Sequence, residues 1–479
     1  MAGDAGFEYI IERERGLRQR LSAARISMIA IGGAIGTGLF LGSGVAISLA
    51  GPAVLVSYGI GALIALLLMG CLAEMSIAHP TSGSFGAYAE YYLGPLAGFL
   101  VRYAYWTGVV LAVGTEVTAV ALYMRYWFPT LPGWIWISSF SAVLIAINAR
   151  SVSLFGAVEY WFSATKVVAI VVFIALASFL VLHGRQPRFD NYTAHGGFLP
   201  HGWWGAWVAV IVAVFSYLSI EMIAVAAGEA QDPRRAIRSA FRSTVLRLIL
   251  FYLLTLALIL ALVPWSAAGI EESPFVKVMR AFNVPAAAAL VNLVILIAAL
   301  SAMNSQLYIT TRMMFSLARA GDAPARFGRL NARGVPLQAL LLSSLGISAA
   351  TVLSVVSPER AYLLMVSISA FGAMFTWLMI FVTHYFFRRV RSVQKDTFRM
   401  VGYPATTILG GALMCAVLLT TAFTGTFRLT LVFGLPYLAL LCLLYRWRRQ
   451  RRTSSAPAQA VLDDSQEPAR ALTSAHGAE

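Results

Sequence analysis

Long apolar runs are the feature that most constrains how this chain can fold. A helix needs about 20 consecutive apolar residues to cross the hydrocarbon core of a bilayer. Twelve runs of about this length follow one another along the sequence, separated by turn-forming residues. They cover 26–50, 54–78, 98–128, 132–149, 155–182, 203–228, 243–264, 286–316, 336–356, 362–387, 404–424 and 427–446. We therefore predict an all-α membrane protein with twelve transmembrane helices.

The composition agrees with this class and excludes a large soluble domain. Hydrophobic residues make up 59% of the 479 residues and charged residues 12%, whereas soluble domains have about 45–50% and about 25%. So few charges cannot cover a soluble core with polar surface. The three cysteines lie far apart within apolar runs, which indicates small buried side chains and neither a metal site nor a disulfide framework.

The basic residues test the topology and set its orientation. With the N-terminus in the cytoplasm, 28 of the 36 Lys and Arg residues fall in cytoplasmic segments, 7 fall outside, and Lys166 alone lies within a span. Such an excess is typical of cytoplasmic loops. We predict a multi-pass protein of the cytoplasmic (inner) membrane with both termini in the cytoplasm. The net charge of +15 then faces anionic lipid headgroups, and no nucleic-acid partner is expected.

The same pattern divides the chain into four predicted parts. Residues 1–25 form a cytoplasmic N-terminal segment without an apolar core, so the first span itself is expected to act as the insertion signal. Residues 26–387 hold ten spans, and 404–447 hold two further helices. Residues 448–479, rich in Ala, Ser and Pro, are predicted to be a disordered cytoplasmic tail.

Glycines interrupt the first apolar run, whose residues 31–44 read IGGAIGTGLFLGSG. A glycine inside a helix is about 1 kcal/mol less favourable than alanine, and unwound backbone at membrane depth is tolerated only where it lines a cavity or is buried in protein. The freed N–H groups and the half-helix that follows would attract an anion such as a carboxylate. Close helix packing of the GxxxG type is the alternative. A dinucleotide-binding loop is disfavoured because no strand precedes the glycines.

A second interruption is predicted in the sixth run, where residues 215–221 (FSYLSIE) place small polar residues and a carboxylate in mid-span. Polar and charged groups within spans mark paths for solutes or protons by default. Interruptions in the first and sixth segments are the pattern of inverted-repeat transporters with a site near the midplane. We therefore predict a transporter of a small solute.

Three motifs resemble the amino acid–polyamine–organocation superfamily: the glycine segment 31–44, the loop 79–85 (HPTSGSF) and the stretch 215–233 (FSYLSIEMIAVAAGEAQDP). Within it, the chain is similar over about residues 15–450 to bacterial permeases for GABA, proline, aromatic and basic amino acids. The resemblance implies a leucine-transporter-like 5+5 inverted repeat with spans 1 and 6 unwound, followed by two C-terminal helices.

The resemblance also implies which residues bind the substrate. Backbone groups of Gly36, Thr37 and Gly38 would hold an α-carboxylate. Carbonyls of Ala34, Phe215 and Leu218 would hold the amine, with Phe215 as an aromatic gate. The predicted pocket side chains on spans 3, 6, 8 and 10 are Val113, Glu116, Ser219, Asn304 and Ser369.

Two ionisable residues deep in the spans are candidates for proton coupling. In the resembled family, a lysine at the position of Lys166 takes the place of the sodium ion of sodium-coupled relatives, which favours a proton here. The alternative is a structural lysine paired to a carboxylate or to carbonyls. Glu116 could sense protonation or the substrate amine, or it could pair with Lys166. Asn304 could form the pocket wall or join two helices through a hydrogen bond.

These observations predict a secondary active transporter that takes up an amino acid with a proton by alternating access. An amino acid exchanger and a sensor that binds without transport are the alternatives. No catalytic triad, P-loop or metal-ligand spacing is visible, so an enzyme, ATP coupling and a cofactor are not expected. The predicted pocket has no excess of acidic residues, which favours a neutral amino acid or GABA.

Overall fold

The computed structural model describes residues 2–17, 21–183, 189–267, 272–281, 285–357, 360–390 and 398–450. Every named element within these residues is a helix. The chain divides into two compact units, Met1–Gly434 and Leu435–Glu479. In the second unit the described residues, 435–450, belong to the apolar helix Leu429–Gln450. The predicted disordered tail lies outside the described residues from residue 451 onward.

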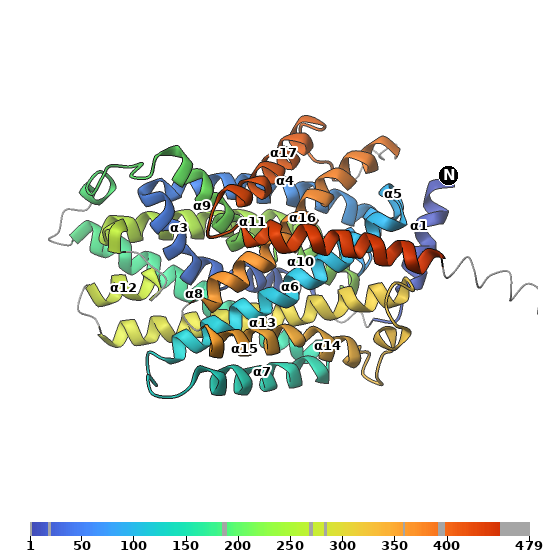
Figure 1. Cartoon of the computed structure of the whole chain (residues 1–479), viewed down its shortest axis with the longest axis horizontal. Helices are drawn as coiled ribbons and strands as arrows, with labels where there is room; N and C mark the ends of the chain where they lie inside the picture. Colours follow the sequence, from blue (N-terminus) through green and yellow to red (C-terminus); the bar gives the residue numbers. More distant parts are fainter. Residues whose placement is uncertain are drawn as a thin grey trace, which may run out of the picture. The chain divides into compact units, whose positions relative to one another are not determined.

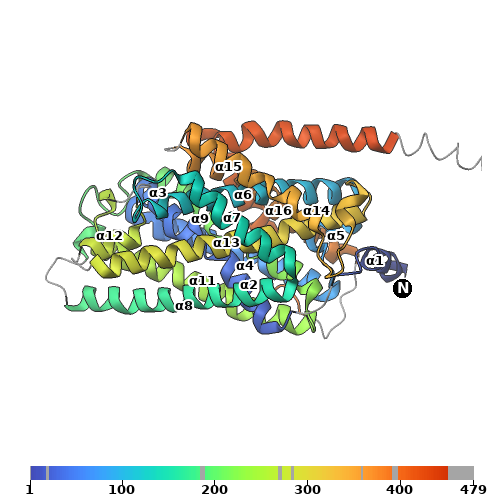
Figure 2. The ribbon, with the colours of Figure 1, turned by 90° about the horizontal axis from the view of Figure 1, so that it is seen from below.

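The long helices of the first unit lie side by side (Figure 1). Its α-helices are, in chain order, α1 (Ala2–Arg13), α2 (Ala23–Ala34), α3 (Ser43–Ala50), α4 (Val54–Ala78), α5 (Ser84–Leu93), α6 (Pro95–Met124), α7 (Gly133–Arg150), α8 (Val152–His183), α9 (Gly202–Tyr217), α10 (Met222–Ala226), α11 (Pro233–Leu262), α12 (Pro274–Ala281), α13 (Pro285–Arg319), α14 (Leu337–Ser343), α15 (Leu345–Val356), α16 (Ala361–Val390) and α17 (Ala405–Thr420). Figures 1 and 2 both place α1 and α5 at one end of this bundle and α12 at the other. We call these the α1 end and the α12 end.

Ten helices within the described residues are long and apolar enough to cross a membrane. This confirms an all-helical, multi-pass membrane protein, whereas the number twelve stays a prediction. Two predicted spans are not counted as whole helices. The run 26–50 is interrupted, so its second half is counted together with α4, and the run 243–264 contributes only the short apolar stretch Ile249–Leu262 of α11.

The helix is interrupted at both places where the sequence predicts it. In the first segment α2 ends at Ala34, the next two residues are bent, and the chain resumes as a π-helix, η1 (Gly38–Gly42). In the second, the chain turns after Tyr217, and Ser219 adopts a left-handed φ of 76° before α10 begins. The half-helix α9 packs against α3, and α10 packs against α2. The two interrupted segments therefore run in opposite directions and cross at their interruptions.

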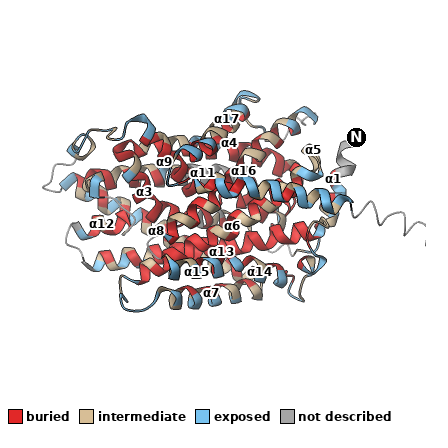
Figure 3. Ribbon diagram, in the orientation of Figure 1, coloured by how far each residue is buried: buried red, intermediate tan, exposed pale blue. Residues whose placement is uncertain are grey.

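Burial follows from which helices meet lipid and which meet protein. Buried residues concentrate on the central helices α6, α9 and α13 (Figure 3). By contrast, α8 lies along one side of the bundle in Figure 2 and exposes apolar side chains such as Val168 and Val172. An exposed apolar face is stable where the solvent is lipid. A buried polar residue on α8 therefore turns away from the lipid and toward the protein interior.

Candidate functional site

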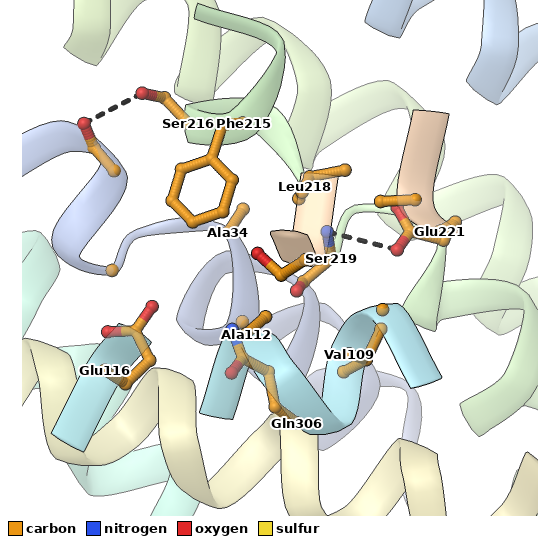
Figure 4. Close-up of a pocket in the computed structure, with 16 residues that line it drawn as sticks. Ala34, Val109, Ala112, Glu116, Phe215, Ser216, Leu218, Ser219, Glu221 and Gln306 are labelled. Atoms are coloured by element: carbon orange, nitrogen blue, oxygen red, sulfur yellow. Dashed lines mark hydrogen bonds between the residues drawn. The ribbon is translucent and has the colours of Figure 1, made fainter. Parts of the chain in front are cut away.

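A cavity lies where the two interrupted segments cross (Figure 4). Both interruptions contribute to its wall, together with one face each of α6, α13 and α16. The residues that line it are Gly33, Ala34, Gly36, Gly38, Gly108, Val109, Ala112, Glu116, Phe215, Ser216, Leu218, Ser219, Glu221, Gln306, Ser369 and Ala373. Because unwound backbone faces this space, peptide groups that a continuous helix would use internally are available to a ligand.

Most of the predicted site residues meet at this cavity. Those on its wall are Ala34, Gly36, Gly38, Glu116, Phe215, Leu218, Ser219 and Ser369. Three other predicted substrate-binding residues are not part of the wall. Val113 is fully buried in α6, one turn before Glu116. Thr37 has a buried side chain but a backbone N–H that contacts Glu116. Asn304 hydrogen-bonds to Glu159 and Asn148, so it joins α13 to α8 and α7.

The carboxylate of Glu116 lies directly on the first interruption. The N–H of Thr37 donates to Glu116 Oε2 at 3.3 Å. Gly36 makes room for this contact, since a Cβ on it would lie 3.0 Å from Glu116 Oε1. Glu116 faces Phe215 from the opposite side of the cavity (Figure 4). Backbone of the glycine segment thus binds a carboxylate in this structure, and that carboxylate belongs to the protein itself.

Tyrosine hydroxyls hold the two interruptions together. Tyr252 of α11 contacts both segments, with its hydroxyl 2.7 Å from the Ala34 carbonyl and 3.0 Å from that of Ser216. The Ser216 hydroxyl donates to the Gly38 carbonyl at 2.8 Å and lies 2.9 Å from the Tyr58 hydroxyl. Neither tyrosine is among the residues that the sequence predicts for the site. The available signal was that a buried phenol needs a hydrogen-bond partner, which an apolar run cannot supply along its own length.

Lys166 binds the first interruption from outside the cavity. Its side chain is fully buried, and Nζ donates to the carbonyl of Ile35 at 2.9 Å. Ile35 is one of the two bent residues between α2 and η1, so this carbonyl is free of the helical pattern. Electrostatic attraction also links Lys166 to Glu159 and Glu116. The lysine therefore ties α8 to the same unwound backbone that Glu116 contacts from α6.

Glu221 closes the second interruption. It accepts hydrogen bonds from Tyr105 at 2.7 Å and from Trp377 at 3.1 Å, and its Oε1 also accepts from the N–H of Ser219 at 3.2 Å. It thereby joins the turn to α6 and α16. Among the described residues, no group of three or more His, Cys, Asp or Glu side chains is placed to hold a metal ion. The site is therefore built from peptide groups, hydroxyls and a few ionisable side chains.

Comparison with known proteins identifies the family to which this chain belongs. The family model for amino acid permeases matches residues 25–451. The chain belongs to the amino acid permease family. It is accordingly a multi-pass membrane protein whose function is amino acid transport. This confirms the resemblance seen in the three sequence motifs.

Several curated relatives are similar over nearly the whole permease. A gamma-aminobutyric acid permease of Bacillus subtilis is 37% identical over 457 residues, which is 93% of this chain and 97% of the relative. A putative histidine permease of the same organism is 37% identical over 447 residues, covering 90% and 94%. An aromatic amino acid transport protein of Salmonella typhimurium is 36% identical over 438 residues, covering 89% and 95%.

The close crossing of the two segments predicts a strong effect of one glycine. A Cβ on Gly38 would lie 2.7 Å from the backbone Cα of Ser216, so Gly38→Ala must push the interruptions apart. Overpacking of this kind destabilises by about 1–3 kcal/mol. We expect a lower melting temperature and at least a tenfold slower initial uptake in proteoliposomes. The matched control is Gly59→Ala, because a Cβ on Gly59 meets nothing within 4 Å. Equal behaviour of the two variants would contradict the proposed close contact.

Proposed function

We propose that this permease takes up a neutral amino acid or GABA together with a proton, by alternating access. The observation that carries the proposal is the cavity at the crossing of two interrupted helices, where a backbone N–H already binds a carboxylate. In this proposal the helices form a 5+5 inverted repeat followed by two C-terminal helices. Transport then consists of movement of the interrupted segments around a substrate that they hold.

The peptide groups at the interruptions supply the substrate's binding partners. We assign its α-carboxylate to Gly36, Thr37 and Gly38. We assign its amine to the carbonyls of Ala34, Phe215 and Leu218, with Phe215 as the gate. The substrate carboxylate and Glu116 compete for the Thr37 N–H, because two carboxylates that share one donor repel each other. Binding therefore requires Glu116 to take up a proton or to swing toward the substrate amine, which links substrate binding to the charge of Glu116.

Lys166 supplies the link between protonation and movement. While it is charged, it holds the Ile35 carbonyl and restrains the first interruption. Loss of its proton weakens this hydrogen bond, since charged donors bind about twice as strongly as neutral ones. The first segment is then free to move relative to α8. A proton delivered to Lys166 restores the restraint.

The orientation follows from the basic residues. We place the α1 end in the cytoplasm, because the basic segments at the start of the chain and around 312–333 lie in cytoplasmic parts of the predicted topology. Both termini are then cytoplasmic, and the protein resides in the cytoplasmic membrane. The cavity lies between the two ends, as a site near the midplane requires.

Uptake into proteoliposomes tests the proposal. The purified permease is given labelled GABA, histidine, phenylalanine, proline, alanine or lysine under an inward proton gradient, and competition among them ranks the substrates. We expect accumulation of at least one neutral substrate, abolished by a proton ionophore. No gradient-driven accumulation of any substrate contradicts proton coupling. Rapid counterflow without gradient-driven uptake supports an exchanger instead, and binding without flux supports a sensor.

A further inference from the structure

Besides Lys166, α8 contains a second buried ionisable side chain, which the proposed transport scheme does not use. Glu159 is fully buried. Its carboxylate accepts hydrogen bonds from Asn304 at 2.9 Å, from Ser163 at 3.3 Å and from the hydroxyl of Ser301. These described donors are all neutral. A buried carboxylate is expensive to desolvate, and an amide would join α8 to α13 without that penalty. Joining the two helices does not require a carboxylate, so we expect Glu159 to have a further function.

The position of Glu159 relative to Lys166 suggests that function. The two residues are seven positions apart on α8, which is two helical turns or about 10.5 Å along the axis, and they share one face. Ser163 lies between them on that face, and its single hydroxyl proton is within reach of two acceptors, Glu159 at 3.3 Å and the Met28 carbonyl at 2.8 Å. Lys166 attracts Glu159 electrostatically. The surrounding elements contribute neutral groups: Ser301 and Asn304 of α13, Asn148 of α7, and the Met28 carbonyl of α2, which accepts from Ser163.

Glu159 also lies on the way from Lys166 to the α1 end. One turn before it, Gly156 faces Leu21, since a Cβ there would lie 3.0 Å from the leucine side chain. Phe155 stacks on Tyr308 of α13 at 4.2 Å between ring centroids, and the Tyr308 hydroxyl donates to Glu229 at 2.7 Å. Ionisable groups therefore follow one another from the cavity toward this end. In order, they are Glu116, Lys166, Glu159 and Glu229.

We propose that Glu159 is a second proton carrier, which takes the proton from Lys166 and passes it toward the α1 end. The inference rests on the proton coupling proposed above. In the transfer, an N–H bond of the Lys166 ammonium breaks and an O–H bond forms on the Glu159 carboxylate. For this relay the Ser163 hydroxyl turns its proton from the Met28 carbonyl to Glu159 and takes one from Lys166 in exchange, so it ends unchanged. Lys166 becomes neutral and releases the Ile35 carbonyl, and Glu159 becomes neutral until its proton leaves.

The substitution Glu159→Gln separates carrying a proton from joining two helices. Glutamine keeps the size of the side chain and an oxygen that accepts from Asn304, but it cannot release a proton. It therefore imitates a permanently protonated Glu159. A permease with this side chain can still exchange bound substrate across the membrane, but net uptake stops. We expect counterflow within about twofold of the wild type. Gradient-driven accumulation should fall from about tenfold per pH unit to about onefold, and substrate-induced proton entry, read with a pH dye inside the liposomes, should disappear.

Controls make each outcome decisive. Glu272→Gln is the same chemical change at a partly buried carboxylate that pairs with the exposed Arg280, and it should accumulate substrate like the wild type. If the wild type itself shows no gradient-driven accumulation, the proposed function fails before Glu159 is tested. If Glu159→Gln accumulates as well as the wild type, the relay is overturned. If Glu159→Gln also loses counterflow, the variant Glu159→Asp distinguishes a proton carrier from a purely structural residue. Recovery of both activities by this shorter carboxylate supports the carrier, and recovery of neither assigns Glu159 to structure alone.

Discussion

Proteoliposomes containing Lys166→Ala are expected to equilibrate the substrate across the membrane without concentrating it. With the membrane potential clamped at zero, one co-transported proton contributes about 1.4 kcal/mol per pH unit, or a tenfold concentration ratio. A gradient of two pH units should therefore allow the wild type up to about hundredfold accumulation. The alanine variant lacks the group whose charge restrains the Ile35 carbonyl. The ratio of its substrate concentrations inside and outside the liposomes should be about one, while counterflow continues.

Two further variants separate the proton of Lys166 from its charge. Arginine does not lose its proton in proteins, so Lys166→Arg keeps a donor near the Ile35 carbonyl and should also fail to accumulate substrate. Lys277→Ala is the matched control, because Lys277 donates to the Ala267 carbonyl away from the cavity. Full accumulation by Lys166→Ala would show that coupling does not pass through this lysine.

The sequence predicts the membrane class and the two interruptions because both depend on local patterns. A run of about 20 apolar residues can only be buried or face lipid. The glycines of 31–38 and the polar residues of 215–221 stand out against such runs, and each set weakens the helix at its own position. The structure breaks the helix after Ala34 and after Tyr217, within these two stretches. Once two interruptions are placed, the peptide groups that line the cavity follow from the chain itself.

Contacts between distant helices could not be predicted in this way. The sequence allows Asn304 either to form part of the pocket wall or to join two helices through a hydrogen bond, and only the packing of α13 on α8 brings it to Glu159. The contacts of Tyr252 likewise depend on helix packing, because this side chain reaches both interruptions from α11. Each of these side chains is a polar group within a predicted apolar span. The hydrophobic periodicity and the composition of the run show that such a residue needs a hydrogen-bond partner, but they do not show which helix supplies it.

The first 25 residues illustrate the same limit at the α1 end. The sequence predicts only a basic cytoplasmic segment here, yet residues 2–13 form α1, and Glu14, the next residue, is buried. The Glu14 carboxylate accepts from the Gly83 N–H at 2.6 Å, from Thr81 at 2.8 Å and from Ser316 at 2.7 Å. These donors come from the 79–85 loop and from α13. The loop motif therefore has a visible structural role, which is to bind the N-terminal segment.

Arg102 of α6 is the centre of this cluster. Its guanidinium contacts Glu90 at 2.7 Å, Glu14 at 3.3 Å and the Ser316 hydroxyl at 3.0 Å. Glu90 also binds Arg13 through two hydrogen bonds of 2.8 Å. Burial opposes the charge of Glu90, but Arg13 and Arg102 outweigh it and lower the pKa of Glu90 to about 2. The ordinary pKa is 4.5, so the stabilisation from this carboxylate is complete above about pH 4.5 and is lost as the pH falls toward 2.

Arg102→Ala is expected to destabilise the α1 end more than any other change to its ion pairs. Removing one partner of a buried pair leaves an uncompensated charge and costs about 3–5 kcal/mol. Here that charge is on the buried Glu14, since Glu90 keeps its two hydrogen bonds from Arg13. At pH 7 we expect a clearly lower melting temperature in detergent and faster protease cleavage between α1 and α2. The difference from the wild type should narrow between pH 4.5 and 2, because Glu90 becomes neutral there. Arg15→Ala removes an exposed pair with Glu12 and should change neither measurement. An Arg102→Ala protein as stable and protease-resistant as Arg15→Ala would show that α1 is held by its apolar contacts instead.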